Sequence, residues 1–311
     1  MAAADSQDMR QAERGELAPE GHIATRSPDG SSLISDADVR FWHEHGYLRI
    51  PQVYSPEEMD LLDSEFEWLK ADWAEDGAGW QGPWRRVLMD EQTEAQSKLI
   101  AMHELHLYSQ DWMKAITKPE LGAALGRLIG PAVEVHHSTM HTKPPETGHP
   151  FPMHQDHPFY AHDDLRYADV LVHLDDTFHE NGEIRFLDGS HKKGYIPHVM
   201  ANAVEGHEPA LADGASTPHL STDEYRHADT VAVPAKRGDV VLFNLCTVHG
   251  SYINQTDRDR RLVRVGYRHP ENAQTSGHAL GRPGVMVNGK RPRRGPDGSK
   301  RRGLHPAFSK L

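Results

Sequence analysis

The stretch Asp239-Val-Val-Leu-Phe-Asn-Leu-Cys-Thr-Val-His249-Gly-Ser251 joins an apolar run to a polar end. The turn residues Lys236–Asp239 stand immediately before the apolar run. A turn followed by a short apolar run predicts a buried strand, here over residues 239–248. We therefore interpret this segment as a buried strand that ends in a His-Gly-Ser site.

Other short strands are expected on both sides of this segment. The dipeptide Asn181-Gly182 predicts a tight hairpin turn between two of them. Many short strands separated by regular turns are typical of a β-sandwich or barrel, so we predict a mainly β fold such as a jelly roll. The expected strands cover residues 133–141, 150–156, 167–174, 183–187, 229–233, 239–248 and 261–268.

Helix signals precede the strands and predict helices that flank the β core. Ser35 with Asp38 resembles a capping box, and Gly46 is placed to end that helix before a short strand at 47–50. Ser55-Pro-Glu-Glu58 begins a second helix that is expected to reach about Trp73. A third helical region, interrupted around Pro119, covers roughly residues 109–129.

Composition divides the 311-residue chain into three parts. Residues 1–30 are polar and are expected to form a mobile leader. Residues 31–275 are expected to form a single domain, with a loop insertion at about 199–228. Residues 276–311 form a basic tail rich in Gly and Pro. This tail is expected to be solvated or to lie on the protein's own acidic surface, although anion binding is an alternative.

The bulk composition argues against several classes of protein. The net charge of −12 makes general binding of nucleic acid or membrane surfaces a poor expectation, despite the basic tail. The single cysteine, Cys246, rules out an intramolecular disulfide and a cysteine-based zinc cluster. The chain has no apolar run of 18 residues and a polar beginning, so we expect no membrane span and a cytoplasmic location.

A Gly- and Trp-rich segment, residues 76–90, contains Trp80 and Trp84. A long aromatic loop of this kind could cover a pocket. The alternative is a surface crossover whose tryptophans pack down onto the body of the protein. The sequence leaves both interpretations open.

Metal-binding chemistry is suggested by His-x-Asp triplets, because residues two apart lie on one face of a strand. Two histidines and a carboxylate on one side of an iron leave positions for oxygen and a co-substrate, which suggests oxidative chemistry. His154-Gln-Asp156 lies at the end of the candidate strand 150–156, and His249 could complete its ligand set. The motif alone is weak, because it occurs four times and a hydrogen-bonded or solvated histidine is the alternative for each. The three competitors are His162-x-Asp164, His173-x-Asp175 and His227-x-Asp229.

Arginines stand immediately before or at the start of the strand predicted over 261–268. Arg258, Arg260 and Arg261 are the candidates, and a guanidinium can bind a carboxylate through two parallel hydrogen bonds. An arginine facing inward near an iron would suit a dicarboxylate co-substrate. The alternative is a solvated turn that faces acidic neighbours.

Several motifs together resemble the phytanoyl-CoA dioxygenase family. They are Lys143-Pro-Pro-Glu-Thr-Gly148, His154-Gln-Asp156, Glu180-Asn-Gly-Glu-Ile184, Asp188-Gly-Ser-His191 and His249-Gly-Ser251 with Arg260 eleven residues after His249. The family's usual Pro-Gly-Ser-His is altered, because Asp188 replaces the proline. The resemblance covers about residues 33–270.

The resemblance implies a double-stranded β-helix, a jelly-roll or cupin-like core, that uses Fe(II), 2-oxoglutarate and O2. It implies that His154, Asp156 and His249 hold the iron. Arg260 would bind the distal carboxylate of 2-oxoglutarate, with Ser251 nearby and Thr139 as another co-substrate contact. Other histidines that could line the cavity are His103, His106, His137 and His141.

The function implied is hydroxylation of a small-molecule substrate, with release of succinate and CO2. One alternative is a catalytically inactive family member that binds metal or ligand. A zinc hydrolase is a third possibility, but the sequence has no HExxH motif. The basic tail raises a fourth, a nucleic-acid demethylase. The substrate and the oligomeric state are not predicted by the sequence.

Overall fold

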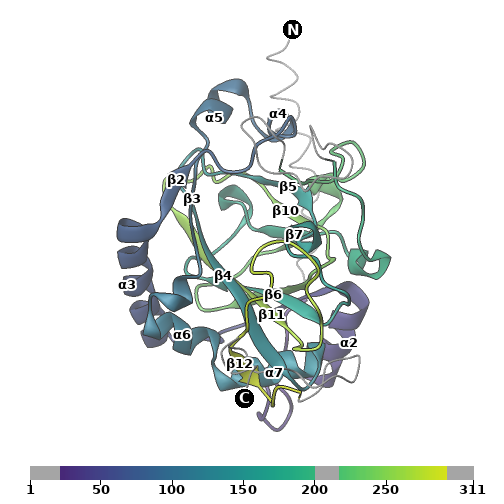
Figure 1. Cartoon of the computed structure of the whole chain (residues 1–311). Helices are drawn as coiled ribbons and strands as arrows, with labels where there is room; N and C mark the ends of the chain where they lie inside the picture. The colour runs from purple at the N-terminus through teal and green to yellow at the C-terminus, as the bar shows by residue number, and fades with distance from the viewer. Residues whose placement is uncertain (1–21, 200–216, 293–311) are drawn as a thin grey trace, which may run out of the picture.

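The computed structural model describes residues 22–199 and 217–292, which fold around two antiparallel sheets. The strands are β1 (Tyr47–Ile50), β2 (Glu75–Gly77), β3 (Leu99–His103), β4 (Val133–Lys143), β5 (Phe151–His154), β6 (Tyr167–His173), β7 (Ile184–Phe186), β8 (Val231–Val233), β9 (Val240–Asn244), β10 (His249–Ser251), β11 (Arg260–Arg268) and β12 (Met286–Asn288). The larger sheet has the order β1-β9-β6-β11-β4-β3-β2, and β12 also pairs with β4. Figure 1 labels the strands β6, β11, β4, β3 and β2 of this sheet. The smaller sheet has the order β5-β10-β7-β8. This arrangement is the predicted double-stranded β-helix.

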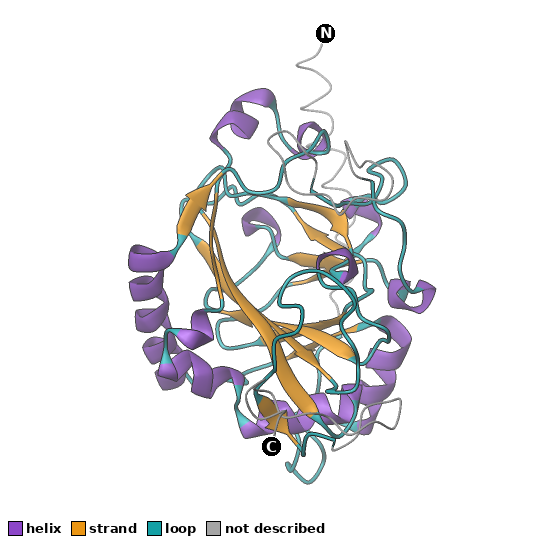
Figure 2. Cartoon of the chain, in the orientation of Figure 1, coloured by secondary structure: helices purple, strands orange, loops and turns teal. Residues whose placement is uncertain are grey.

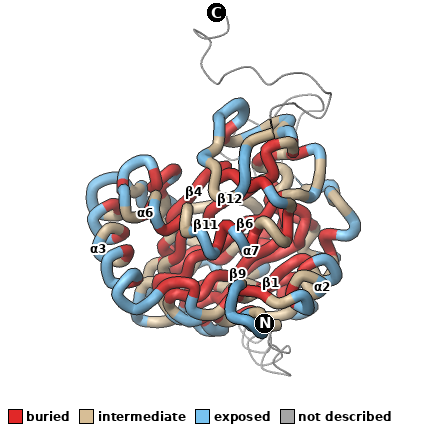
Figure 3. The backbone as a smooth tube through the Cα atoms, turned by 90° about the horizontal axis from the view of Figure 1, so that it is seen from below, coloured by how far each residue is buried: buried red, intermediate tan, exposed pale blue. Residues whose placement is uncertain are grey.

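The two sheets pack face to face, and apolar side chains fill the space between them. Phe186 of the smaller sheet packs with Leu171 and Leu262 of the larger sheet. The opposite face of the larger sheet, which includes Val263 and Val265, packs against the helices. Successive residues of β11 therefore face opposite sides, as a strand requires. Figure 3 shows these strands as buried and the outer turns of the helices as exposed.

The helices flank the sheets, as predicted, and lie along the outside of the molecule (Figure 2). They are α2 (Asp36–His45), α3 (Pro56–Trp73), α4 (Arg85–Leu88), α5 (Glu91–Gln96), α6 (Gln110–Ile116) and α7 (Pro119–Ile129). Short 3-10 turns are η1 (Leu105–Leu107), η2 (His157–Phe159), η3 (His179–Asn181), η4 (Ser190–Lys193) and η5 (His227–Asp229). No helix in the described part of the chain is long and apolar enough to cross a membrane.

Local capping signals predicted the first two helices correctly. Ser35 forms a capping box with Asp38, and Gly46 ends α2 in the left-handed conformation at φ 83°. Ser55 forms a second capping box with Glu58 at the start of α3. In both boxes the serine hydroxyl accepts from a backbone N–H that has no partner within the helix, which stabilises the first turn.

The predicted strand over 239–248 is too long, because only Val240–Asn244 is a strand and residues 245–248 form a turn that leads into the smaller sheet. Strand β9 ends at Asn244 in the larger sheet, and β10 begins at His249 in the smaller one. Between them, the Thr247 N–H donates to the Asn244 carbonyl at 2.8 Å, and the Cys246 N–H donates to the Asn244 side chain at 3.1 Å. This turn contains no Gly or Pro, so the apolar pattern runs through it without interruption.

The hairpin predicted at Asn181-Gly182 is also wrong. Strand β6 pairs with β9 and β11, whereas β7 pairs with β10 and β8, so the segment connects the two sheets. Gly182 still requires glycine, since its φ is 74° and a Cβ there would lie 3.0 Å from the Lys143 Nζ. The turn at Asn181-Gly182 therefore packs against Lys143 in the interior of the barrel.

The boundaries predicted for the leader and the tail need correction. Ala24, expected in the leader, is buried and its N–H donates to the Arg49 carbonyl at 2.7 Å. Strand β12 lies beyond the predicted domain end at residue 275 and pairs with β4. Arg291 forms an ion pair with the buried Glu134, so the described part of the tail lies on the protein's own acidic residues. The rest of these two segments falls in residues 1–21 and 293–311, outside the described residues.

The insertion predicted at about 199–228 is described only at its ends. Residues 200–216 lie outside the described residues. After them, Leu220 is buried, and its N–H donates to the Met153 carbonyl at 2.8 Å. This returning segment therefore packs against β5 beside His154.

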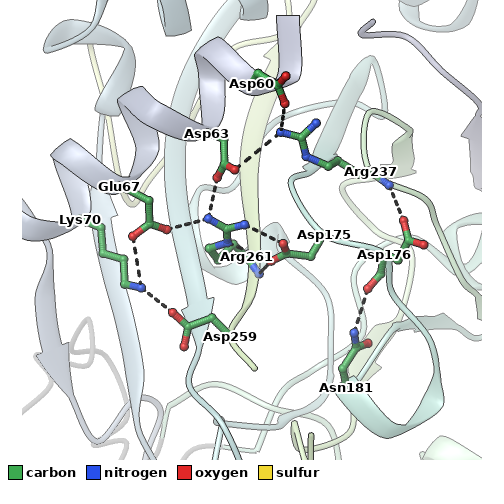
Figure 4. A network of polar contacts seen from close by, with 10 residues as sticks. All are labelled: Asp60, Asp63, Glu67, Lys70, Asp175, Asp176, Asn181, Arg237, Asp259 and Arg261. Atoms are coloured by element: carbon green, nitrogen blue, oxygen red, sulfur yellow. Dashed lines mark hydrogen bonds and ion pairs between the residues drawn. The ribbon is translucent and has the colours of Figure 1, made fainter. Parts of the chain in front are cut away.

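A network of ion pairs fixes α3 to the start of β11 (Figure 4). Arg261 bonds Asp63 at 2.5 Å and Glu67 at 2.7 Å on the helix, and Asp175 at 2.7 Å beyond β6. Lys70 extends the network to Asp259 at 2.5 Å. Because Arg261 faces the helix, its neighbour Arg260 faces the barrel interior.

Candidate active site

Three predicted ligands, His154, Asp156 and His249, meet inside the barrel. His154 ends β5 and His249 begins β10, and the two residues are paired across these strands. The Nε2 atoms of His154 and His249 lie 3.6 Å and 3.8 Å from Asp156 Oδ1. One ligand atom from each of the three residues lies within 4.8 Å of the other two, and all three residues are buried. Nε2 and Oδ1 are therefore placed to hold one metal ion.

Hydrogen bonds orient both imidazole rings. His154 Nδ1 lies 2.7 Å from the Pro152 carbonyl, and His249 Nδ1 lies 2.9 Å from the Thr247 carbonyl. A carbonyl can only accept, so each Nδ1 carries the proton and each Nε2 presents a lone pair. Asp156 Oδ1 faces these lone pairs and has no hydrogen-bond partner. A divalent cation would satisfy all three atoms, so the site fits a metal ion.

Arg264 binds the other oxygen of the central carboxylate. Its Nη1 donates to Asp156 Oδ2 at 2.6 Å and to the Tyr160 hydroxyl at 3.2 Å. Burial opposes ionisation of Asp156, but the positive charge of Arg264 outweighs it and holds the pKa of Asp156 well below its ordinary value. Arg264 is absent from the residues predicted from the sequence, although it lies four residues after Arg260 and therefore on the same face of β11.

The three competing triplets bring their residues to no comparable site. Among the residues that the structure describes, His154, Asp156 and His249 form the only group of three or more suitable ligands. The carboxylate of each competitor is bound by an arginine. These pairs are Asp164–Arg166 at 2.7 Å, Asp175–Arg261 at 2.7 Å and Asp229–Arg226 at 2.8 Å.

Two buried basic residues lie close to the triad. Arg260 and Lys143 are paired across β11 and β4. Lys143 donates to the Ser251 hydroxyl at 2.8 Å, and Arg260 donates to the Gly182 carbonyl at 3.3 Å while its Nε has no partner. Burial lowers the pKa of Arg260 to about 10. In the described part of the chain, neither side chain forms an ion pair with a carboxylate, and burial, followed by the charge of Arg260, lowers the pKa of Lys143 well below its ordinary value.

Thr139 and two of the four histidines predicted as lining residues lie near the same part of the barrel. Thr139 is paired with Arg264 across β4 and β11, and its hydroxyl lies 3.2 Å from His103 Nδ1. His141 is two residues further along β4, and burial, followed by the charges of Arg264 and His103, lowers its pKa well below the ordinary value.

His106 and His137 do not join this group. His106 bonds the Ser138 hydroxyl at 2.6 Å, on the face of β4 opposite to Thr139. His137 lies further along the barrel, 3.2 Å from the Tyr167 hydroxyl.

The aromatic loop covers the triad with one tryptophan and packs down with the other. The Trp80 ring lies 4.6 Å from the His154 ring and 5.0 Å from the Phe159 ring. The buried Arg85 donates to the Trp80 carbonyl at 2.9 Å, which fixes the loop. Trp84 is buried, as the second interpretation of this loop expected, whereas Trp80 lies against His154.

A double-stranded β-helix with a His-x-Asp and distal His triad beside an inward-facing arginine defines the class of Fe(II)- and 2-oxoglutarate-dependent oxygenases. Comparison with known proteins agrees. The family model for phytanoyl-CoA dioxygenase (PhyH) matches residues 42–262, and the chain belongs to this family.

Relatives that are similar in sequence include oxygenases named for their substrates. An ectoine dioxygenase of Stutzerimonas stutzeri (strain A1501) is 28% identical over 263 residues, which cover 81% of this chain and 82% of the relative. An L-proline trans-4-hydroxylase of Streptomyces griseoviridis is 24% identical over 268 residues, covering 83% of this chain and 94% of the relative.

Solved structures share the fold. EctD from S. alaskensis with 2-oxoglutarate and 5-hydroxyectoine aligns with a TM-score of 0.60 and 22% identity, covering 94% of this chain and 93% of that one. The non-heme alpha ketoglutarate dependent carbocyclase SnoK from nogalamycin biosynthesis aligns with a TM-score of 0.58 and 23% identity, covering 78% of this chain and 88% of that one. The protein is therefore an Fe(II)- and 2-oxoglutarate-dependent dioxygenase, with O2 as the second co-substrate.

Proposed function

We propose that the enzyme hydroxylates a small polar metabolite and releases succinate and CO2. The observation that carries this proposal is the buried, unpaired Asp156 Oδ1, which faces the Nε2 atoms of His154 and His249. In this proposal these three residues hold Fe(II). Bound iron, together with 2-oxoglutarate and O2, supplies the oxidising power for attack on a C–H bond.

The surrounding residues have distinct tasks in this proposal. Arg260 and Ser251 bind the distal carboxylate of 2-oxoglutarate, because a buried guanidinium without a carboxylate partner favours an anion. Thr139 provides a further co-substrate contact. Trp80 excludes water from the metal site, which limits oxidation that is not coupled to the substrate.

The proposed substrate class rests on two supports. The relatives are named for ectoine and L-proline, which are small polar molecules. The residues near the triad include Arg264, His103 and His141, which suit a polar ligand better than a long apolar chain. Ectoine, L-proline and related small polar metabolites are therefore the first substrates to test.

Turnover of 2-oxoglutarate under air tests the reaction directly. The purified enzyme with Fe(II) should form succinate and a product heavier by one oxygen atom, measured by mass spectrometry across a metabolite panel. A catalytically inactive family member would bind metal or 2-oxoglutarate and yield no succinate with any panel member.

The choice of metal triplet is tested by a matched pair of variants. Asp156→Ala should abolish metal binding and product formation, because it removes the central ligand. Asp175→Asn changes the competing triplet and should leave metal affinity within about twofold, since Asp175 is bound by Arg261. Metal retained by Asp156→Ala and lost by Asp175→Asn would move the site to His173 and Asp175.

The choice of arginine is tested in the same way. Arg260→Ala should raise the 2-oxoglutarate concentration needed for half-maximal rate by roughly a hundredfold, the range expected for a buried charged contact. The exposed Arg258 provides the control, and Arg258→Ala should leave that concentration unchanged. An unchanged requirement in Arg260→Ala would contradict its role as the anchor.

A further inference from the structure

His137 has a ring nitrogen that is buried without a partner. Its Nε2 forms no hydrogen bond with any residue in the described part of the chain, although the side chain is fully buried. A buried polar atom without a partner is costly, so such an atom usually meets a ligand or a water molecule. The other nitrogen, Nδ1, lies 3.2 Å from the Tyr167 hydroxyl and 3.1 Å from His136 Nδ1. These contacts decide which nitrogen of His137 carries the proton.

The proton positions are set from Gln274, which follows β11 in the chain. Its Nε2 donates to the carbonyls of Ser276 at 3.0 Å and His278 at 2.5 Å, which fixes the orientation of the amide. Its Oε1 then faces His136 Nε2 at 2.9 Å. An amide oxygen only accepts, so His136 Nε2 carries a proton. Burial is the main cause that lowers the pKa of His136 to about 2, so the ring is neutral and its Nδ1 has a lone pair.

The Tyr167 hydroxyl connects His136 to His137. It lies 2.8 Å from His136 Nδ1 and donates its one proton to that lone pair. The Tyr167 oxygen and His136 Nδ1 then have no proton left for His137, so His137 Nδ1 is the donor. Burial, followed by the charge of Arg264, lowers the pKa of His137 well below its ordinary value, so this ring is also neutral. His137 Nε2 is therefore a hydrogen-bond acceptor with an unused lone pair.

The backbone brings these rings together. The register between β4 and β11 shifts between Gly266 and Tyr267, which leaves His136 as an extra residue in β4. Gly266 is paired with His137, and a Cβ there would overlap the Tyr167 hydroxyl and lie 2.6 Å from His137 Cε1. The bulge and the glycine therefore make room for the chain of hydrogen bonds.

The segment that carries Gln274 is fixed to the residues that follow Asp156. The His278 N–H donates to the Phe159 carbonyl at 2.8 Å. Gly277 has φ 86°, and a Cβ there would overlap the same carbonyl. The segment thus approaches η2 as closely as a glycine allows, which holds Gln274 in one position.

His137 lies near the metal site. It is two residues before Thr139 on β4 and therefore on the same face, and Thr139 is paired with Arg264. Arg264 donates to Asp156 at 2.6 Å and to the Tyr160 hydroxyl at 3.2 Å, and the Tyr160 ring lies 4.7 Å from the His137 ring. Arg264 Nε also lacks a partner among the described residues. One unpartnered atom is a donor and the other an acceptor, which suits a ligand that carries both kinds of group.

We propose that His137 is a specificity-determining residue whose Nε2 accepts a hydrogen bond from an N–H or O–H group of the substrate. Gln274, His136 and Tyr167 are positioning residues that keep this nitrogen an acceptor. The substrate class is thereby narrowed to small polar molecules that carry such a donor. This inference rests on the proposed function, because it assigns the missing partner of His137 to the substrate. The alternative is a buried water molecule on Nε2 and a purely structural role.

Nitrogen NMR of the full-length protein, isotope-labelled at histidine, tests the proton positions without any substrate. The spectrum of His137→Gln assigns the signals of His137. In the wild type Nδ1 should carry the proton and Nε2 should show the shift of an unprotonated nitrogen. Gln274→Lys replaces an acceptor by a donor, so each hydrogen bond in the chain reverses and the proton should move to His137 Nε2. Gln274→Glu keeps an acceptor and should keep the wild-type pattern.

The spectra can contradict the inference in two ways. A proton on His137 Nε2 in the wild type would overturn it. A folded Gln274→Lys with the wild-type pattern would overturn the role of Gln274, His136 and Tyr167 as positioning residues. If Gln274→Lys does not fold, the spectra of the wild type and of Gln274→Glu decide.

Methylated ligands test the role of His137 in substrate recognition. L-Proline and its N,N-dimethyl betaine share a ring and a carboxylate, but only L-proline has N–H donors. Any other panel member that turns over is paired with its own N- or O-methyl analogue. Calorimetry with the Mn(II)- and 2-oxoglutarate-loaded protein measures binding. The wild type should prefer the ligand with the donor by roughly 10-fold or more, and His137→Leu should reduce this preference to within about twofold. His137→Gln keeps an acceptor and should restore part of it.

The matched control is His106→Leu, which changes a buried histidine that bonds Ser138 on the opposite face of β4 and should keep the wild-type preference. A preference that is the same in the wild type and in His137→Leu, or absent from the wild type, would overturn the inference. A purely structural role would lower the Tm of His137→Leu without changing the preference. If His137→Leu does not fold, Gln274→Lys must lose the preference, because its His137 Nε2 is a donor. Absence of succinate with every panel member would contradict the proposed function, whereas the nitrogen spectra would still decide the proton positions of His137.

Discussion

The two oxygens of Asp156 have different environments, and this difference organises the site at the scale of single residues. Oδ1 faces the two histidines and lacks a hydrogen bond, whereas Oδ2 accepts from Arg264 at 2.6 Å. Asp169 is buried nearby, and burial together with the charge of Asp156 raises its pKa well above the ordinary value. Arg264 thus provides the positive charge that allows a charged carboxylate to lie next to a second carboxyl group.

Replacement of Arg264 by Met should weaken Co(II) or Mn(II) binding by roughly 10- to 100-fold, the range typical for residues that orient metal ligands. Asp156 would lose the donor that fixes Oδ2 and the charge that compensates its burial. Titration with Co(II), followed by absorbance, measures the affinity. Arg237→Met, which removes an ion pair with Asp60 outside the barrel, is the control. If Arg264→Met bound Co(II) as tightly as the wild type does, the backbone alone would position Asp156.

At the scale of elements, the junction between α2 and β1 supports the turn that precedes His249. The Gly46 carbonyl accepts from the Thr247 hydroxyl at 2.7 Å and from the Asn244 N–H at 2.9 Å. Gly46 has φ 83°, and a Cβ there would overlap His191 and lie 2.7 Å from Thr247 Oγ1. Close backbone approach at this point helps to place β10 in the smaller sheet.

Gly46→Ala should therefore destabilise the fold more than an alanine at Gly30. Gly30 has a similar φ of 69°, but a Cβ there would meet no atom within 4 Å. The left-handed conformation alone costs an L-residue about 1–2 kcal/mol. Overlap in a packed region typically adds about 1–3 kcal/mol. Gly46→Ala should therefore lower Tm by at least roughly twice as much as Gly30→Ala does. Thermal unfolding of the two variants measures this, and equal shifts would show that His191 and Thr247 move aside freely.

The aromatic loop should control how tightly oxidation is coupled to the substrate. Trp80→Ala would open the space above His154 to water, which favours side reactions. We expect the ratio of succinate to hydroxylated product to rise several-fold, measured with whichever substrate turns over. Trp73→Ala changes an exposed tryptophan on α3 and should leave the ratio near that of the wild type. An unchanged ratio in Trp80→Ala would contradict a shielding role.

Elements that depend on local signals could be predicted from the sequence, and elements that depend on distant pairing could not. The caps at Ser35, Ser55 and Gly46 are set by neighbouring residues. The break after Asn244 and the sheet change at Asn181-Gly182 are set by which strands lie alongside, which no local pattern records. Spacing and family resemblance identified the triad, but the contact of Arg264 with Asp156 joins β11 to the residues after β5, and no local pattern records it.

At the scale of the whole molecule, the segment after residue 275 completes the larger sheet. Strand β12 pairs with β4, and Val287 packs so closely on α7 that a Cβ on Gly122 would lie 2.7 Å from it. Buried Glu134 is held by Arg268 at 2.8 Å and by Arg291. Removal of all residues after 275 would therefore damage the domain itself and could not test a role of the basic tail in binding.

Two shorter deletions separate stability from any role of the tail. Deletion of 284–311 removes β12 and leaves Glu134 with one arginine, which should cost about 2–4 kcal/mol. For a domain of this size that cost corresponds to a fall in Tm of roughly 5–10 °C. Deletion of 293–311 removes much of the basic segment but none of these contacts, and should leave both Tm and turnover of a small substrate unchanged. If turnover falls while Tm holds, the basic segment takes part in the reaction; equal Tm values for the two deletions would show that β12 adds no stability.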